Sequence, residues 1–268
     1  MNLVEKQLYH APRNNRYILL ISAVLVVLFA WSITAVNIEN LEQSGMSIAG
    51  SILKGIISPD LDLLLATGTQ GVAYLLVETI AIAFLGTIIG SILAIPLAFF
   101  SASNVVPKPV AFITRLLLIF IRTVPALVYG LMFIRVTGPG PFAGVLTIAV
   151  ISIGMLAKLY VDAIEDLDTS IFESMTSIGC TTFEKIRYGI IPQLFSVFLS
   201  IMIYRFDMNL REASILGLVG AGGIGAPLIF AMNAYRWNEV GSILIGLVVL
   251  ILIVELTSNK IRTKLVRG

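Results

Sequence analysis

Residues 71–100 read GVAYLLVETIAIAFLGTIIGSILAIPLAFF, an apolar run whose only charged residue is Glu78. About 20 apolar residues are enough for an α-helix to cross the roughly 30 Å hydrocarbon core of a bilayer. Lipid offers the backbone no hydrogen-bond partners, so a spanning segment must pair its own N–H and C=O groups. The run therefore predicts a membrane-spanning helix.

Further apolar runs elsewhere in the chain extend this prediction to an all-α, polytopic membrane protein with six spans. The other five lie at residues 17–36, 112–136, 142–159, 192–210 and 240–257. The composition agrees, since 57% of residues are hydrophobic and 13% are charged, whereas about a quarter of a soluble domain is charged. The first run follows Arg13 and Arg16, as in a signal peptide, but its length and the lack of a cleavage site favour a retained span.

The positions of lysine and arginine predict the orientation of the chain. Basic residues precede the first span and fill residues 258–268, so both termini are expected in the cytoplasm. Residues 37–70 carry four acidic residues and a single Lys54, and are expected outside. The predicted parts are therefore a tail, first span and external segment (1–70), a five-span core (71–257) and a cytoplasmic tail (258–268). Arg205, Arg211 and Arg236 fit the rule less well, because they fall on the external half.

The longest polar stretch on the inner side, residues 158–192, predicts a pair of short helices. One helix is expected from Glu173 to a stop at Gly179, because glycine adopts the left-handed conformation that ends many helices. Thr181 and Glu184 have the spacing of a capping box, which predicts a second helix that carries Phe183 and Ile186. Proline disfavours helical backbone in the residue before it, so Pro192 is expected to limit this helix. Two helices without a core of their own are expected to dock against another subunit.

The same stretch holds six carboxylates but is not expected to bind a metal. It contains no histidine, and it lacks the glycine and the final glutamate of a calcium-binding loop. A solvated acidic face is the simpler interpretation.

A glycine-rich run follows the fifth span: Gly217, Gly220, Gly222, Gly223 and Gly225. Three of these glycines match the spacing of a dinucleotide-binding fingerprint. That fingerprint requires a strand before it and a helix after it, and this run lies between two predicted spans. Irregular backbone packed within protein or lining a cavity is predicted instead. The chain contains no P-loop sequence, so any ATP hydrolysis must come from another subunit.

Ionisable residues within apolar spans suggest a functional centre. The candidates are Glu78, Arg122, Arg205, Asp207 and the adjacent Arg211, with Pro125 interrupting the third span. They could be paired charges that hold the bundle together, or they could line a substrate path. In the second case an arginine would suit phosphonate or phosphate oxygens. Arg205 and Asp207 do not share a helix face, so each is expected to find a partner on another helix or to line a water-filled path.

The polar stretch resembles a known motif. Glu173-Ser-Met, three residues, Gly179 and then Pro192 resemble the EAA loop of ABC importer permeases, with departures at Ser174, Met175, Gly189 and Ile191. The run from Arg211 to Gly225 and the Arg122-Thr-Val-Pro125 element are similar to the phosphonate-type permease subfamily, with methionine-type permeases as near relatives.

The resemblance implies a bacterial inner-membrane permease of the type I importer fold. It implies that Gly179 makes the turn and that the helix led by Phe183 contacts a cytoplasmic ABC ATPase. The other implied partners are an external substrate-binding protein and a second permease subunit, here expected to be a copy of this chain. The implied substrate is phosphonate, phosphite or a related phosphorus oxyanion, and the permease itself needs no cofactor and performs no covalent chemistry.

Other functions remain open at this level. The first is a permease of the same fold for methionine or another small solute. An intramembrane enzyme would need a reactive set such as H-E-x-x-H, which the sequence lacks. An ion channel would need no docking element for an ATPase. Nucleic acid is not an expected partner, because the chain has no long basic tract interleaved with aromatic residues.

Overall fold

The computed structural model describes residues 15–35, 43–66, 68 and 71–267, which fall into two compact units, residues 1–50 and 51–268. The main element of the first unit is α2 (Asn15–Ala35). This helix is long and apolar enough to span a membrane, and none of its span is buried. The first predicted span is therefore a helix, although its last predicted residue, Val36, lies outside the described residues.

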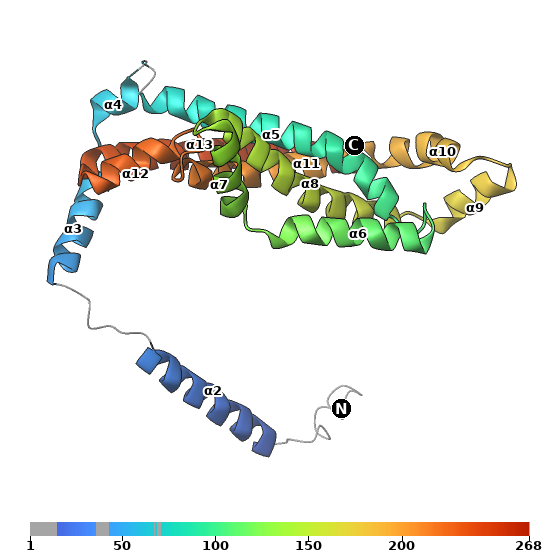
Figure 1. Cartoon of the computed structure of the whole chain (residues 1–268), viewed down its shortest axis with the longest axis horizontal. Helices are drawn as coiled ribbons and strands as arrows, with labels where there is room; N and C mark the ends of the chain where they lie inside the picture. Colours follow the sequence, from blue (N-terminus) through green and yellow to red (C-terminus); the bar gives the residue numbers. More distant parts are fainter. Residues whose placement is uncertain (1–14, 36–42, 67, 69–70, 268) are drawn as a thin grey trace, which may run out of the picture. The chain divides into compact units, whose positions relative to one another are not determined.

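The second unit is a helical bundle (Figure 1). Its long helices are α5 (Val72–Ser101), α8 (Pro141–Glu165), α11 (Ile191–Gly217) and α13 (Trp237–Arg267). Among the described residues of the whole chain, five helical segments have the length and composition of a span, and a bent pair of helices makes a sixth. The predicted all-α membrane fold is therefore confirmed. The division at residues 70 and 257 stays a prediction.

Small residues hold α5 against α8 along the centre of the bundle. A Cβ atom added to Gly90 would lie 2.6 Å from the Cβ of Ser152, and one added to Gly86 would lie 2.6 Å from the Cβ of Ile148. Tyr160, 1% exposed, shares a hydrogen bond of 2.8 Å with the hydroxyl of Ser91. Helices that approach this closely gain van der Waals contact, which drives helix association in lipid.

The third predicted span is broken into two helices. α6 (Lys108–Thr123) and α7 (Ala126–Thr137) meet at an angle of 83°. Val124 is extended, with φ −80° and ψ 124°, because the ring of Pro125 disfavours helical backbone in the residue before it. The predicted interruption is confirmed, and it is a sharp turn rather than a kink within one helix.

The predicted helix end at Pro192 is wrong. α10 (Thr182–Glu184), the π-helix η2 (Lys185–Ile190) and α11 form one continuous helix of 36 residues, Thr182–Gly217. In regular α-helix the proline ring would clash with the carbonyl four residues earlier. The wider turn of η2 comes directly before the proline, and the Ile191 N–H bonds to the carbonyl of Ile186, five residues back.

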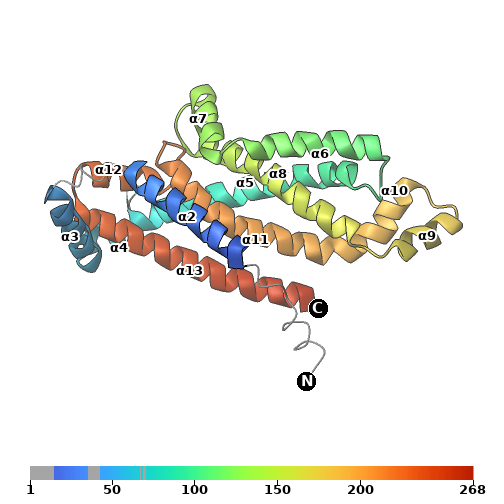
Figure 2. The ribbon, with the colours of Figure 1, turned by 90° about the horizontal axis from the view of Figure 1, so that it is seen from below.

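The remaining helices lie toward the two ends of the second unit. Residues 51–57 of α3 (Gln43–Ile57), α4 (Leu61–Leu65) and α12 (Gly225–Asn233) are at one end, and α9 (Thr169–Ser177) with α10 is at the other (Figure 1). Figure 2 shows α13 running beside α11 between these ends. Within the second unit, α9 and α10 of the predicted inner loop are thus separated from α4 by the length of the bundle.

Candidate functional site

The elbow, defined here as α9, the turn at Gly179, α10 and η2, is ordered by its own local hydrogen bonds. The Cys180 N–H bonds to the Met175 carbonyl at 3.0 Å, and the Gly179 N–H bonds to the Thr176 carbonyl at 3.0 Å. Gly179 has φ +82°, the left-handed conformation of a Schellman motif. The predicted glycine stop is therefore confirmed.

Capping groups fix the start of each elbow helix. The Thr181 N–H donates to Glu184 Oε2 at 2.7 Å, and the Glu184 N–H donates to Thr181 Oγ1 at 3.4 Å, which confirms the predicted capping box. Asp168 caps α9 by accepting the Ser170 N–H at 2.9 Å. Hydrogen bonds from Ser170 lower the pKa of the Asp168 carboxyl below its ordinary value. Two capped helices joined by a left-handed glycine make an elbow of defined angle.

Some apolar side chains of the elbow are exposed, and others pack against the bundle. Phe183 is 68% exposed, and Ile178 and Tyr188 are also exposed. Ile190 is buried, and the half-buried Ile186 packs against the core cluster that contains it. Of the other residues that match the motif, Glu173 and Pro192 are exposed. The elbow is thus held to the bundle on one side and presents Phe183 on the other.

A buried polar centre that the sequence analysis missed ties three helices together. Asn209 of α11 is completely buried. Its Nδ2 donates to Thr87 Oγ1 of α5 and to Ser152 Oγ of α8, both at 2.7 Å. The available signal was a polar amide inside an apolar span, but only the fold brings its two partners, far apart in sequence, to it.

The charged residues of α11 form ion pairs along that helix. Arg205 is 4% exposed and pairs with Glu212, seven residues further along α11, at 3.1 Å. Asp207 pairs with Arg211 at 3.0 Å, and Arg211 also contacts Glu255 of α13 at 3.1 Å. Arg205 and Asp207 therefore pair within α11 and not with another described helix, which makes the first alternative wrong. The second alternative, that they line a water-filled path, stays a prediction. Spacings of four and seven residues bring side chains to one face of a helix.

The glycine-rich run leaves α11 at Gly217 and forms a loop that packs against the start of α5. Gly220, Gly222 and Gly223 have φ of +96°, +83° and +74°. Glu78 Oε1 accepts the Gly223 N–H at 2.9 Å, and Thr79 Oγ1 accepts the Ile224 N–H at 2.9 Å. Glu78 thus anchors this loop directly before α12, which begins at Gly225.

Arg122, the remaining candidate, is exposed near the end of α6. It lines a cavity of about 170 Å³ between α6 and α8, together with Lys158. Pro125 lies just beyond it, at the break between α6 and α7.

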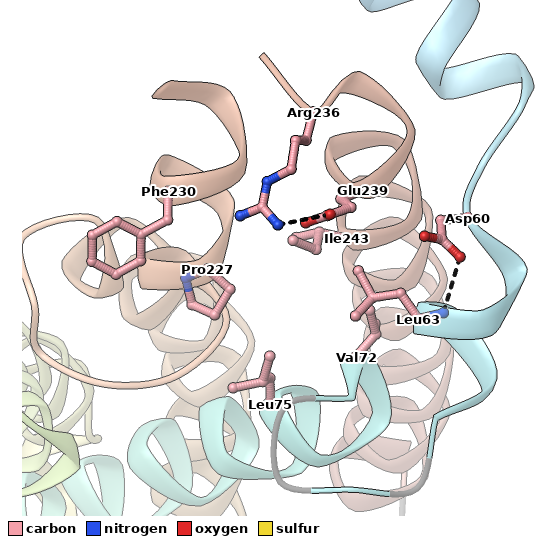
Figure 3. Close-up of a pocket in the computed structure, with 9 residues that line it drawn as sticks. All are labelled: Asp60, Leu63, Val72, Leu75, Pro227, Phe230, Arg236, Glu239 and Ile243. Carbon is pink, nitrogen blue, oxygen red and sulfur yellow. Dashed lines mark hydrogen bonds and ion pairs between the residues drawn. The ribbon is translucent and has the colours of Figure 1, made fainter. Parts of the chain in front are cut away.

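A larger cavity of about 450 Å³ lies at the end of the second unit that holds α4 and α12. Figure 3 shows Arg236 and Glu239 at its rim, opposite Phe230 and Pro227 of α12. Arg236 Nη1 and Glu239 Oε1 are 2.8 Å apart, and the carboxylate of Asp60 caps α4. The charged groups that line this cavity are therefore already engaged with protein partners.

The chain matches one protein family and several named permeases by sequence. Residues 86–265 match the model of the family described as binding-protein-dependent transport system inner membrane component. The phosphate-import permease protein PhnE of Mycolicibacterium smegmatis is 35% identical over 88% of this chain, which spans 43% of that protein. The phosphite transport system permease protein PtxC of Stutzerimonas stutzeri is 33% identical over 70% of this chain and 68% of its own length.

Solved structures agree with the fold. A chain of the inward-facing MetNI methionine ABC transporter aligns with a TM-score of 0.61 at 18% identity, covering 71% of this chain and 94% of that chain. A chain from an amino acid ABC transporter crystallised with histidines gives a TM-score of 0.54 at 22% identity, covering 83% and 94%. With the family model matched over residues 86–265, this chain belongs to the family of binding-protein-dependent transport system inner membrane components.

Proposed function

We propose that this chain is the permease subunit of an ATP-driven importer, and that it forms the pathway for a phosphorus oxyanion such as phosphonate, phosphite or phosphate. The family membership supports the transport role. The names of the Mycolicibacterium and Stutzerimonas relatives support the substrate class. The observation that carries the proposal is the unbroken helix Thr182–Gly217, which begins in the elbow and ends at the glycine-rich loop.

This helix offers a mechanical connection between the cytoplasm and the centre of the bundle. Phe183 and Asn209 are 26 residues apart, which in α-helix corresponds to about 39 Å. A cytoplasmic ATPase that holds the exposed Phe183 would move α11 against α5 and α8. ATP-driven closure of two ATPases would rock the spans and open the path outward, and hydrolysis would reset it. The permease needs no covalent chemistry for this cycle.

The remaining parts of the proposal follow from that role. Two copies of this chain pair around the path, an external binding protein delivers the substrate, and both termini lie in the cytoplasm. Arg205, Asp207, Arg211 and Arg122 are the proposed pathway charges. Glu78 and the glycine-rich loop shape the outer end of the path, because Glu78 holds Gly223 in place.

Uptake by a bacterial strain without its own phosphorus-oxyanion importers tests the proposal. The strain would express this chain with the ATPase and binding protein encoded beside it, and the uptake of labelled phosphate, phosphite, 2-aminoethylphosphonate and methionine would be measured. We expect ATP-dependent uptake of at least one phosphorus oxyanion, which a Gly179→Asp variant that no longer retains the ATPase should abolish. Uptake of methionine alone would overturn the substrate class, and uptake independent of the ATPase would overturn the importer.

A further inference from the structure

The groove between α6 and α8 contains positive charges that the protein itself does not neutralise. Three cations and two carboxylates line this cavity of about 170 Å³, with apolar side chains between them. The cations are Arg115, Arg122 and Lys158, and the carboxylates are Asp162 and Glu165. The net formal charge of the lining is therefore +1.

One cation and one carboxylate of the groove are engaged with each other. Arg115 Nη2 lies 2.5 Å from Glu165 Oε1, and Arg115 Nε also donates to the Ser101 carbonyl at 2.9 Å. The Ser103 N–H donates to the same Glu165 oxygen at 2.7 Å. This pair lies at one end of the groove. The two charges neutralise each other, so neither is available to a ligand.

Arg122 of α6 and Lys158 of α8 lie further along the same groove, away from the Arg115–Glu165 pair. α6 and α8 run antiparallel, because Arg115 meets Glu165 while Arg122 lies against Gly154. Arg122 is seven residues beyond Arg115, and Lys158 is seven residues before Glu165. Seven residues make about two helical turns and a rise of about 10 Å. Both cations therefore stand on the groove face of their helix, at a similar distance from the first pair.

Neither of these two cations has a polar partner within the described part of the chain. No hydrogen bond or ion pair is made by the side chain of Arg122 or Lys158, and both residues are exposed in the single chain. Asp162 is one turn from Lys158, yet no ion pair joins them. Cations inside a spanning segment face a protein interior or a water-filled cavity and require a counter-charge. The described part of the chain supplies no such counter-charge, so both cations are open to a ligand.

We propose that Arg122 and Lys158 bind a tetrahedral phosphorus oxyanion in the α6–α8 groove. A guanidinium offers two parallel donors to two oxygens of such a group, and an ammonium offers a compact charge to a third. The carboxylate of Asp162, which also lines the groove, repels the same anion and keeps binding weak enough for release. The identification of the anion as transported substrate rests on the proposed function. The headgroup of an anionic phospholipid carries the same chemistry.

Binding to the full-length permease in nanodiscs distinguishes the two sources of phosphate. One preparation contains phosphatidylcholine alone, and the other also contains phosphatidylglycerol. Thermal unfolding is followed while sodium phosphite, phosphate or, as an ionic-strength control, sodium chloride is added. We expect phosphite or phosphate to raise the melting temperature in phosphatidylcholine alone. Arg122→Gln and Lys158→Gln should each weaken the apparent affinity at least tenfold.

Three further variants make the result specific to the groove. Arg122→Lys keeps the charge without the paired donors and should retain part of the response, which also controls for misfolding. Asp162→Asn should strengthen anion binding several-fold. Lys108→Gln removes an exposed cation from the start of α6, outside the groove, and should leave binding unchanged.

Each outcome decides the proposal. Stabilisation by phosphatidylglycerol but not by phosphite or phosphate, lost in the same two variants, would assign the groove to a lipid headgroup. An unchanged response of Arg122→Gln and Lys158→Gln to every probe would overturn the site, even if oxyanion uptake were normal. If the wild-type importer takes up no oxyanion but the two variants lose phosphate binding, the proposed function fails and the groove stands.

Discussion

Asn209 of α11 donates a hydrogen bond of 2.7 Å to Ser152 of α8, where both side chains are completely buried. The same amide nitrogen donates to Thr87 of α5 at 2.7 Å. One side chain thus fixes the lateral position of α11 relative to the two most closely packed helices of the bundle.

Replacing Asn209 with leucine should destabilise the bundle. Leucine has the same branched shape and the same number of side-chain heavy atoms, but it leaves two buried hydroxyl groups without their donor, at a cost of about 1–2 kcal/mol. Unfolding in a detergent titration measures the change, with Asn259→Leu on the exposed part of α13 as the control. Equal stability of the two variants would contradict the role of this centre.

Gly90 should not tolerate alanine. Its added Cβ would lie 2.6 Å from Ser152 Cβ and 2.8 Å from the Ala149 carbonyl, so α5 and α8 would have to separate. Overpacking of this kind costs about 1–3 kcal/mol. The control is Gly45→Ala in α3, where nothing lies within 4 Å. Melting temperatures of the purified proteins check the difference, and a neutral Gly90→Ala would show that the helices have room to move apart.

Substitutions at Phe183 and Ile186 should have different effects, the first on binding of the ATPase and the second on the stability of the fold. Phe183→Ala removes a side chain that is 68% exposed, so the free energy of unfolding should change by less than about 0.5 kcal/mol. The amount of ATPase that copurifies should fall at least tenfold.

Ile186→Ala is the matched variant, because this side chain packs against the core cluster around Ile190. It should lower the free energy of unfolding by about 1–3 kcal/mol. A Phe183→Ala protein that retains the full amount of ATPase would remove Phe183 from the docking surface.

Lowering the pH should destabilise the first turn of α9. The pKa of the folded Asp168 carboxyl is lowered by hydrogen bonds from Ser170, so the cap stabilises α9 above the unfolded pKa, about 3.9. That contribution is lost as pH falls through the folded value. Hydrogen exchange of the α9 amides between pH 7 and pH 3 measures it. Asp168→Asn retains a capping side chain without titrating, and its protection should depend less on pH.

The features that the sequence predicted correctly depend on local signals. Span positions follow from the length of apolar runs, and the turn of the elbow follows from Gly179 and from the spacing of Thr181 and Glu184. The continuation of the helix through Pro192 was missed, because η2 widens the turn before the proline without any local mark in the sequence. The partners of Arg205 and Asn209 depend on which side of α11 faces which neighbour. That information exists only after the helices have packed.

The continuous helix from Thr182 to Gly217 couples rotation as well as movement along its axis. Each residue of a helix advances by about 100° around the axis as well as 1.5 Å along it, so the direction in which Phe183 points is tied to that of Asn209. A partner bound to Phe183 as proposed would therefore rotate the segment that carries Asn209 as well as shift it. A single residue inserted between them would turn the buried amide away from Thr87 and Ser152 while leaving the elbow around Phe183 unchanged.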